Sequence, residues 1–160
     1  MINTTTVTLP SETEIVITRT FEAARELVFT VWTTPEYVRR WWTSTEAPLI
    51  MCEIDLRVGG RWRYVSRDAS GVELGWSGVY RVIEAPRRLV TTETFEGSPG
   101  VEAITTLGLT ERAGRTTMTI TVRHDSQENR DNHVSSGMEA GLNRSLRRID
   151  DILDQLTKEQ

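Results

Sequence analysis

The chain has 160 residues, of which 38% are hydrophobic and 26% charged, and its 23 acidic and 19 basic residues give a net charge of -4. These proportions are typical of a folded globular protein and exclude a disordered chain. The acidic excess argues against nucleic-acid binding, because the molecule as a whole lacks a positive field for phosphates. No apolar run approaches the roughly 18 residues of a membrane span, and the N-terminus lacks a signal-peptide pattern. We therefore expect a cytoplasmic protein with no integral membrane segment.

Cysteine and histidine are too scarce to suggest a metal site. Cys52 is the single cysteine, which excludes an internal disulfide, and we interpret it as a small buried residue of a strand. Together with His124 and His133 it shows no recognisable zinc-ligand spacing. The sequence His124-Asp125-Ser126 contains the residue types of a triad, but adjacent side chains point in different directions. We therefore expect no metal, no cofactor and no catalytic residues of a recognised type, and we interpret His133 as an exposed or capping residue.

The N-terminal part of the chain predicts an arm followed by a strand. Residues 1–12 are polar and rich in threonine, which favours a flexible arm. A β-branched run follows, in which Ile15 and Ile17, with Arg19 as a further candidate, alternate with outward residues. This alternation predicts a first strand that ends near Phe21.

Two short helices are predicted next. Residues 22–32 place apolar side chains at helical spacing, with charged residues on the other face. Residues 35–42 start a second helix, because Thr34 suits the capping position and Pro35 suits the first helical position. The two helices should meet at Pro35.

Residues 49–124 have no helical period and consist of β-branched runs separated by turn residues. This pattern predicts six strands in an antiparallel meander. The five expected turns are Gly59-Gly60, Asp68–Gly71, Pro86-Arg87, Gly97–Gly100 and Ala113-Gly114.

The C-terminal segment predicts one long amphipathic helix. Asp125 and Glu128 have the spacing of a capping box, and the helix would be about 28 residues long. Its apolar stripe consists of Val134, Met138, Leu142, Leu146, Ile149, Leu153 and Leu156.

The order of these elements predicts an α+β fold over residues 13–157, in a single domain. A seven-stranded antiparallel sheet must bury one face, and the long helix is the only element large enough to cover it. We therefore expect a curved sheet that wraps around the C-terminal helix, with two short helices after the first strand.

The stretch LRVGGRWRYVSR, residues 56–67, combines arginines, aromatics and a glycine pair. A strand pattern follows Gly59-Gly60, so the pair predicts a hairpin turn and not a phosphate loop, which would lead into a helix. Period-two alternation places Trp62 and Tyr64 on one face and the neighbouring arginines on the other. We expect the aromatics to point inward, because a buried unpaired guanidinium is costly.

The register of this hairpin is left open by the sequence. An even loop would place Arg57 opposite Trp62 and Asp55 opposite Tyr64, and so add a polar pair to the inner face. An odd loop with a bulge would instead place Leu56 opposite Trp62.

Trp76, Gly78 and Tyr80 form a similar face on the following strand, either as packed core or as the wall of a cavity. Small residues on the helix, Gly137 and Gly141, either let the helix approach the sheet closely or leave room behind it, and the second alternative would give a cavity. Glu93 and Glu102 lie on strands whose facing is undetermined, and either could be an acid in the cavity. The candidate ligand-binding residues are Trp42, Asp55, Arg57, Trp62, Tyr64, Trp76, Tyr80, Met138 and Leu142.

Four motifs carry a family resemblance: PEYVRRWW (35–42), DLRVGGRWRY (55–64), WSGVYRVIEAPRRLV (76–90) and SSGMEAGLNRSLRRIDDIL (135–153). With the order of the elements, they resemble the homologues of the C-terminal domain of activators of the heat-shock-protein-90 ATPase. This family belongs to the helix-grip (SRPBCC) superfamily of START domains, birch-pollen-type allergens and polyketide cyclases. The resemblance implies a hydrophobic cavity between sheet and helix. The residues that it places on the lining elements are Trp62, Trp76, Tyr80, Met138 and Leu142.

Three functions follow as hypotheses. The favoured one is binding of a small hydrophobic or aromatic ligand in the cavity. The second is a polyketide cyclase-like or aromatase-like enzyme, in which Tyr64, Tyr80, Asp55 and Arg57 orient the substrate. If Asp55 and Arg57 lie outside the sheet, this enzyme hypothesis loses its strongest candidate residues. The third is a chaperone-interacting or stress-response protein, or a homodimer, that uses the exposed sheet or Trp41-Trp42. The chaperone-binding N-terminal domain of the eukaryotic activators is absent from this sequence, so chaperone activation is not expected of it.

Overall fold

A computed structural model describes residues 4–159 of the chain. The helices are α1 (Arg25–Thr33), α2 (Pro35–Trp41), α3 (Gln127–Ser135) and α4 (Met138–Lys158). The strands are β1 (Thr6–Thr8), β2 (Glu14–Phe21), β3 (Leu49–Ile54), β4 (Arg61–Arg67), β5 (Glu73–Glu84), β6 (Arg88–Phe95), β7 (Glu102–Arg112) and β8 (Arg115–Arg123).

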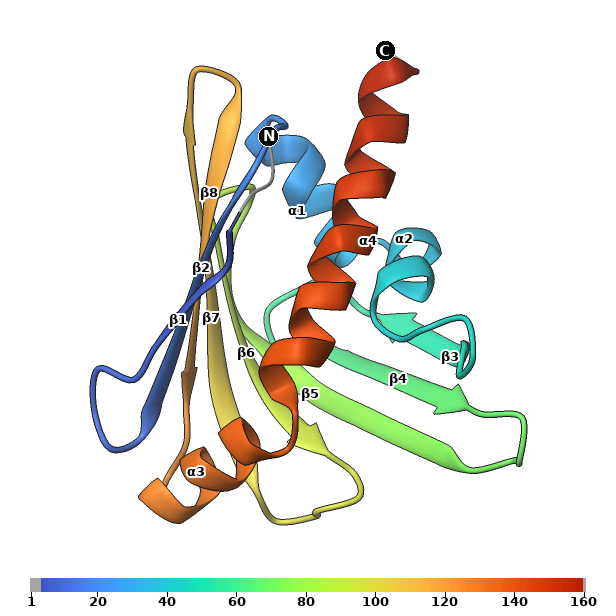
Figure 1. Cartoon of the computed structure of the whole chain (residues 1–160), viewed down its shortest axis with the longest axis vertical. Helices are drawn as coiled ribbons and strands as arrows, with labels where there is room; N and C mark the ends of the chain where they lie inside the picture. The colour runs from blue at the N-terminus through green and yellow to red at the C-terminus, as the bar shows by residue number, and fades with distance from the viewer. Residues whose placement is uncertain (1–3, 160) are drawn as a thin grey trace.

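The strands form one antiparallel sheet in the order β1-β2-β8-β7-β6-β5-β4-β3. The six strands from β3 to β8 follow the chain as a meander, as predicted, and β2 closes against β8. The sheet curves around α4, which crosses its concave side, while α1 and α2 lie beside the middle and the C-terminal half of this helix (Figure 1). The α+β helix-grip architecture predicted from the sequence is therefore confirmed, with eight strands in place of seven.

The eighth strand comes from the segment expected to be a flexible arm. Thr6 pairs with Thr18 and Thr8 with Val16, so β1 adds an outer strand beside β2. The threonines that suggested a polar arm are also β-branched, and this favours a strand where a partner edge is available. Residues 1–3 of the expected arm lie outside the described residues.

The two short helices meet at Pro35, as predicted. The backbone carbonyl of Ala24 accepts a hydrogen bond from Val28 N at 3.2 Å at the start of α1. Thr34 precedes Pro35 in extended conformation and caps α2 through its backbone, with no side-chain hydrogen bond. Pro35 fits there because its missing N–H would have no helical partner.

The prediction of one unbroken C-terminal helix is wrong. Ser136 and Gly137 separate α3 from α4, and Gly137 has a φ of 85°, a left-handed conformation that breaks the helix. The cap of α3 is Ser126, whose hydroxyl accepts from Asn129 N at 3.1 Å, in place of the expected Asp125. Val134, assigned to the apolar stripe, lies before the break and is 37% exposed.

The apolar stripe of α4 supplies the core that the helix shares with the sheet. Leu146, Ile149 and Leu153 are buried as predicted. No helix within residues 4–159 is long and apolar enough to span a membrane.

Candidate functional site

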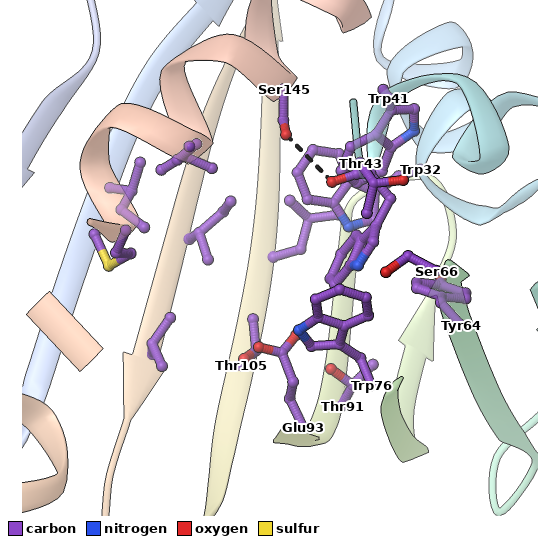
Figure 2. A pocket seen from close by; sticks show the side chains of 18 of the residues that line it. Trp32, Trp41, Thr43, Tyr64, Ser66, Trp76, Thr91, Glu93, Thr105 and Ser145 are labelled. Carbon is purple, nitrogen blue, oxygen red and sulfur yellow. Dashed lines mark hydrogen bonds between the residues drawn. The ribbon is translucent and has the colours of Figure 1, made fainter. Parts of the chain in front are cut away.

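A pocket of about 650 Å³ lies between the concave face of the sheet and α4. Side chains from the sheet, from the two short helices and from the loop after α2 also line it (Figure 2). This volume is within the range of small-molecule binding sites.

Strand β4 supplies one wall of the pocket. Trp62 and Tyr64 point inward and are each 5% exposed, as the period-two alternation predicted. Arg61 and Arg63 lie on the other face, where Arg63 donates hydrogen bonds of 3.0 and 2.9 Å to Glu96. The arginines of this strand are therefore separated from its aromatic rings.

Both predicted registers of the β3–β4 hairpin are wrong. Ile54 pairs with Trp62, and Cys52 pairs with Tyr64, because residues 55–60 form a longer connection than either alternative assumed. Gly59 has a φ of 83°, which fits the predicted glycine turn.

Asp55 and Arg57 therefore lie in the connecting loop and not on the inner face. They bind each other, with Arg57 Nε 2.9 Å from Asp55 Oδ2, and their side chains are 51% and 71% exposed. Neither residue lines the pocket.

Strand β5 continues the wall with Trp76 and Tyr80, and a glycine between them is required by close packing. A Cβ atom at Gly78 would lie 1.8 Å from the carbonyl oxygen of Thr92 and 2.6 Å from Trp62 Nε1. Gly78 thus allows β6 and the Trp62 indole to approach the backbone of β5 closely.

Trp42 lies at the centre of the aromatic lining. Its ring centroid is 4.9 Å from that of Tyr64, 5.8 Å from Trp76 and 6.1 Å from Trp62, each in an edge-to-face arrangement. Because Trp42 follows the last residue of α2, the short helices carry this ring into contact with two strands of the sheet.

Helix α4 supplies the opposite side of the pocket. Met138 and Leu142 line it, together with the small residues Gly141 and Ser145. Ser145 Oγ lies 3.5 Å from the Trp42 carbonyl, the dashed contact in Figure 2. Gly137 does not line the pocket, because it forms the break before the helix.

Of the described residues that line the pocket, one carries a carboxyl group, Glu93 on β6. Burial raises the pKa of Glu93 from 4.5 to about 7. Glu102, the other acid considered from the sequence, is 54% exposed beside Arg81 and does not line the pocket. Glu93 is thus partly protonated at neutral pH.

Burial also shifts the pKa of two tyrosines that line the pocket and of Cys52, which pairs with Tyr64 across β3 and β4. Burial raises the pKa of Tyr64 and of Tyr80 above the usual value, and it raises the pKa of the Cys52 thiol to about 11. Cys52 is therefore a buried thiol, as expected, and has little thiolate character at neutral pH.

His124 and His133 form a pair, and the second of them lines the pocket. His124 Nε2 lies 3.0 Å from His133 Nδ1, which joins the segment after β8 to α3. Burial lowers the pKa of His124, and burial with the neighbouring His124 charge lowers the pKa of His133 to about 4. His133 lines the pocket and is half-buried, so its interpretation as an exposed or capping residue is wrong.

Three polar atoms of pocket-lining residues are buried without a hydrogen-bond partner among the described residues: Thr43 Oγ1, Thr105 Oγ1 and Trp62 Nε1. Such atoms are available to a ligand or a water molecule. Residues 4–159 contain no group of three or more potential metal ligands.

Seven of the nine candidate residues from the sequence line this pocket, and Asp55 and Arg57 do not. The role of all nine residues in ligand binding stays a prediction. Sequence reasoning did not identify several other lining residues, because they lie on elements whose inward faces depend on tertiary packing. These residues include Trp32, Ser66, Thr91, Thr105 and Arg144.

A curved sheet around a C-terminal helix, with a pocket between them, defines a START-like helix-grip protein. The profile of the family described as "Activator of Hsp90 ATPase homolog 1-like protein" matches residues 22–154. The chain belongs to this family, which confirms the resemblance recognised in the sequence.

Solved structures support the same fold. A protein from Rhodobacter sphaeroides is 26% identical, with a TM-score of 0.89 over 94% of this chain and 98% of that chain. A protein from Arthrobacter aurescens is also 26% identical, with a TM-score of 0.82 over 94% and 91%. An AHSA1-like protein from Aeromonas hydrophila is 22% identical, with a TM-score of 0.71 over 87% and 93%. No curated protein sequence matches the chain.

Proposed function

We propose that the protein binds a small hydrophobic or aromatic ligand in the pocket between the sheet and α4. The observation that carries this proposal is the lining, in which seven tryptophan and tyrosine rings border a space of about 650 Å³. They are Trp32, Trp41, Trp42, Trp62, Tyr64, Trp76 and Tyr80. Burial of an apolar ligand contributes roughly 25 cal/mol per Å² of its surface, which is enough for micromolar binding after the costs of association.

Titration with Nile red, a neutral fluorescent dye, tests this function. The wild-type protein should bind the dye saturably and with enhanced emission. Met138→Trp should weaken binding by about tenfold or more, because a larger side chain fills the pocket. Val134→Trp adds the same indole on α3, at a residue that does not line the pocket, and should bind like the wild type.

Two results would contradict ligand binding. One is a lack of saturable dye binding by a folded wild-type protein. The other is equal affinity of the wild type and Met138→Trp, since this would place the dye elsewhere.

A cyclase-like or aromatase-like activity is the second candidate. Asp55 and Arg57 no longer support it, but Glu93 does, because a carboxyl group with a pKa of about 7 suits proton transfer at neutral pH. Incubation with a short poly-β-ketone thioester and mass spectrometry would detect a dehydrated ring product. Formation of that product by wild type and Glu93→Gln alike would exclude Glu93 as the acid.

Interaction with a chaperone, or formation of a homodimer, is a third proposal. It is supported by exposed apolar side chains on and beside β3, β4 and β5. These are Ile50, Leu56, Val58, Val72 and Leu74. A monomeric mass in light scattering, together with no retention on immobilised Hsp90, would contradict it. Cytoplasmic localisation stays a prediction from the sequence.

A further inference from the structure

Glu93 is surrounded on its two neighbouring strands by side chains that share its face of the sheet. Trp76 pairs with Phe95 across β5 and β6, and Thr105 pairs with Thr91 across β6 and β7. Each pair lies two residues from Glu93, so Trp76 and Thr105 are its diagonal neighbours. Figure 2 shows the carboxyl end of Glu93 directed toward these two side chains.

The carboxyl group has no counterion within the described residues. Glu93 takes part in no ion pair or side-chain hydrogen bond there, although Thr105 Oγ1 is also buried without a partner. Burial is the sole cause of its raised pKa, which means that no cation nearby stabilises the ionised form.

The other titratable groups that line the pocket do not supply this counterion. Arg148 donates to the Trp41 carbonyl at 3.2 Å and to Ser145 Oγ at 3.1 Å. Arg144 is exposed on α4. The remaining groups are two tyrosines and one histidine. Tyr64 and Tyr80 carry no positive charge at any pH, and the lowered pKa of His133, about 4, keeps its ring neutral near pH 7.

The surroundings of Glu93 therefore suit a cation brought in by a ligand. An ionised carboxylate is costly in an apolar pocket unless it is paired, and an ammonium group would pair it. The ring of Trp76, 5.8 Å from that of Phe95, lies on the same wall, and aromatic rings also attract ammonium groups.

We propose that the ligand of this pocket is an apolar or aromatic molecule with one protonated amine, and that Glu93 binds the ammonium group. Thr105 Oγ1 accepts a second hydrogen bond from it. This inference rests on the proposed ligand-binding function and narrows the chemical class of the ligand.

Three matched probes test the charge preference: 1-naphthylmethylamine, 1-naphthalenemethanol and 1-naphthoate. Calorimetry near pH 7 should show that the amine binds about tenfold to a hundredfold more tightly than the alcohol. Because burial raises the pKa of Glu93 to about 7, part of the protein carries a protonated Glu93 at this pH, and amine binding should release protons. Titrations in buffers of different ionisation enthalpy measure this release.

Glu93→Gln keeps the shape of the side chain and should lose the preference for the amine while it still binds the alcohol. Glu102→Gln removes an exposed carboxylate from the neighbouring strand and should retain the preference. If Glu93→Gln does not fold, the pH dependence of binding by the wild type tests the inference. Its affinity for the amine should increase from about pH 6 to about pH 8 as Glu93 ionises, while its affinity for the alcohol should not.

Equal binding of the amine and the alcohol by the wild type would overturn the inference and leave ligand binding intact. Preferential binding of naphthoate would also overturn it and would indicate selection by Arg144. A lack of saturable binding of all three probes would overturn the proposed function as well.

Discussion

The guanidinium group of Arg19 on β2 donates hydrogen bonds of 2.6 and 2.5 Å to the carboxylate of Asp150 on α4. The Arg19 side chain is only 4% exposed, whereas that of Asp150 is 37% exposed. Arg19 also lies 4.8 Å from the centre of the Phe21 ring. This ion pair joins the first long strand to the C-terminal helix and compensates a buried positive charge.

Removal of the Asp150 carboxylate, the partner of Arg19, should destabilise the protein. Asp150→Ala leaves Arg19 buried without its counterion, and we expect a loss of about 2–4 kcal/mol in the free energy of unfolding. Urea unfolding followed by tryptophan fluorescence measures it. Asp151→Ala, at the next and exposed position of α4, should change this free energy by less than about 0.5 kcal/mol. Equal losses in the two variants would contradict a specific role of the ion pair.

Glu93 should make the protein less stable as the pH rises. Its pKa is about 7 in the folded protein and 4.5 ordinarily, so the folded state binds more protons between these values. The stability present below pH 4.5 is therefore lost as the pH rises through about 7, by on the order of 2–3 kcal/mol.

Urea unfolding at about pH 5 and about pH 8 checks this dependence. Glu93→Gln should gain stability relative to the wild type at the higher pH, because the variant has no carboxyl group to ionise. Glu102→Gln should show the same pH dependence as the wild type. A constant difference between Glu93→Gln and wild type across this range would be inconsistent with the burial of Glu93.

The histidine pair should make the protein less stable as the pH falls, which is the opposite of the effect expected for Glu93. The pKa of His133 is about 4 in the folded protein against 6.5 ordinarily, so the unfolded state binds more protons in this window. Stability is complete above pH 6.5 and is lost as the pH falls toward about 4, by on the order of 2 kcal/mol. His133→Gln should reduce this loss in thermal unfolding measured at several pH values. If its stability fell as steeply as that of the wild type, the pair would not be responsible.

Gly78 should not tolerate a side chain. A Cβ atom there would overlap the Thr92 carbonyl and Trp62 Nε1, so Gly78→Ala should cost about 2 kcal/mol or more and displace the Trp62 ring. Gly108→Ala on β7 is the matched control, because its nearest contact is an ordinary 3.8 Å. Urea unfolding and near-ultraviolet circular dichroism should separate the two variants. Similar losses of stability would argue against the close approach at Gly78.

Much of the fold could be predicted because its signals are local. Alternation along β4 predicted that Trp62 and Tyr64 face inward, and turn residues predicted the six-stranded meander. The register of the β3–β4 hairpin could not be predicted in this way, because it depends on how residues 55–60 pack against the ends of three strands. The prediction for Asp55 and Arg57 depended on that register.

The sequence by itself determined which elements form and which side chains share a face, since period and propensity are properties of neighbouring residues. Only the tertiary structure decided which residues of distant elements those faces contact. It paired Arg19 with Asp150, 131 residues away, and it placed Glu93 in a pocket that is also lined by a helix beginning 45 residues later. The charge of a side chain is written in the sequence, but its pKa and its partner depend on which distant elements exclude water from it.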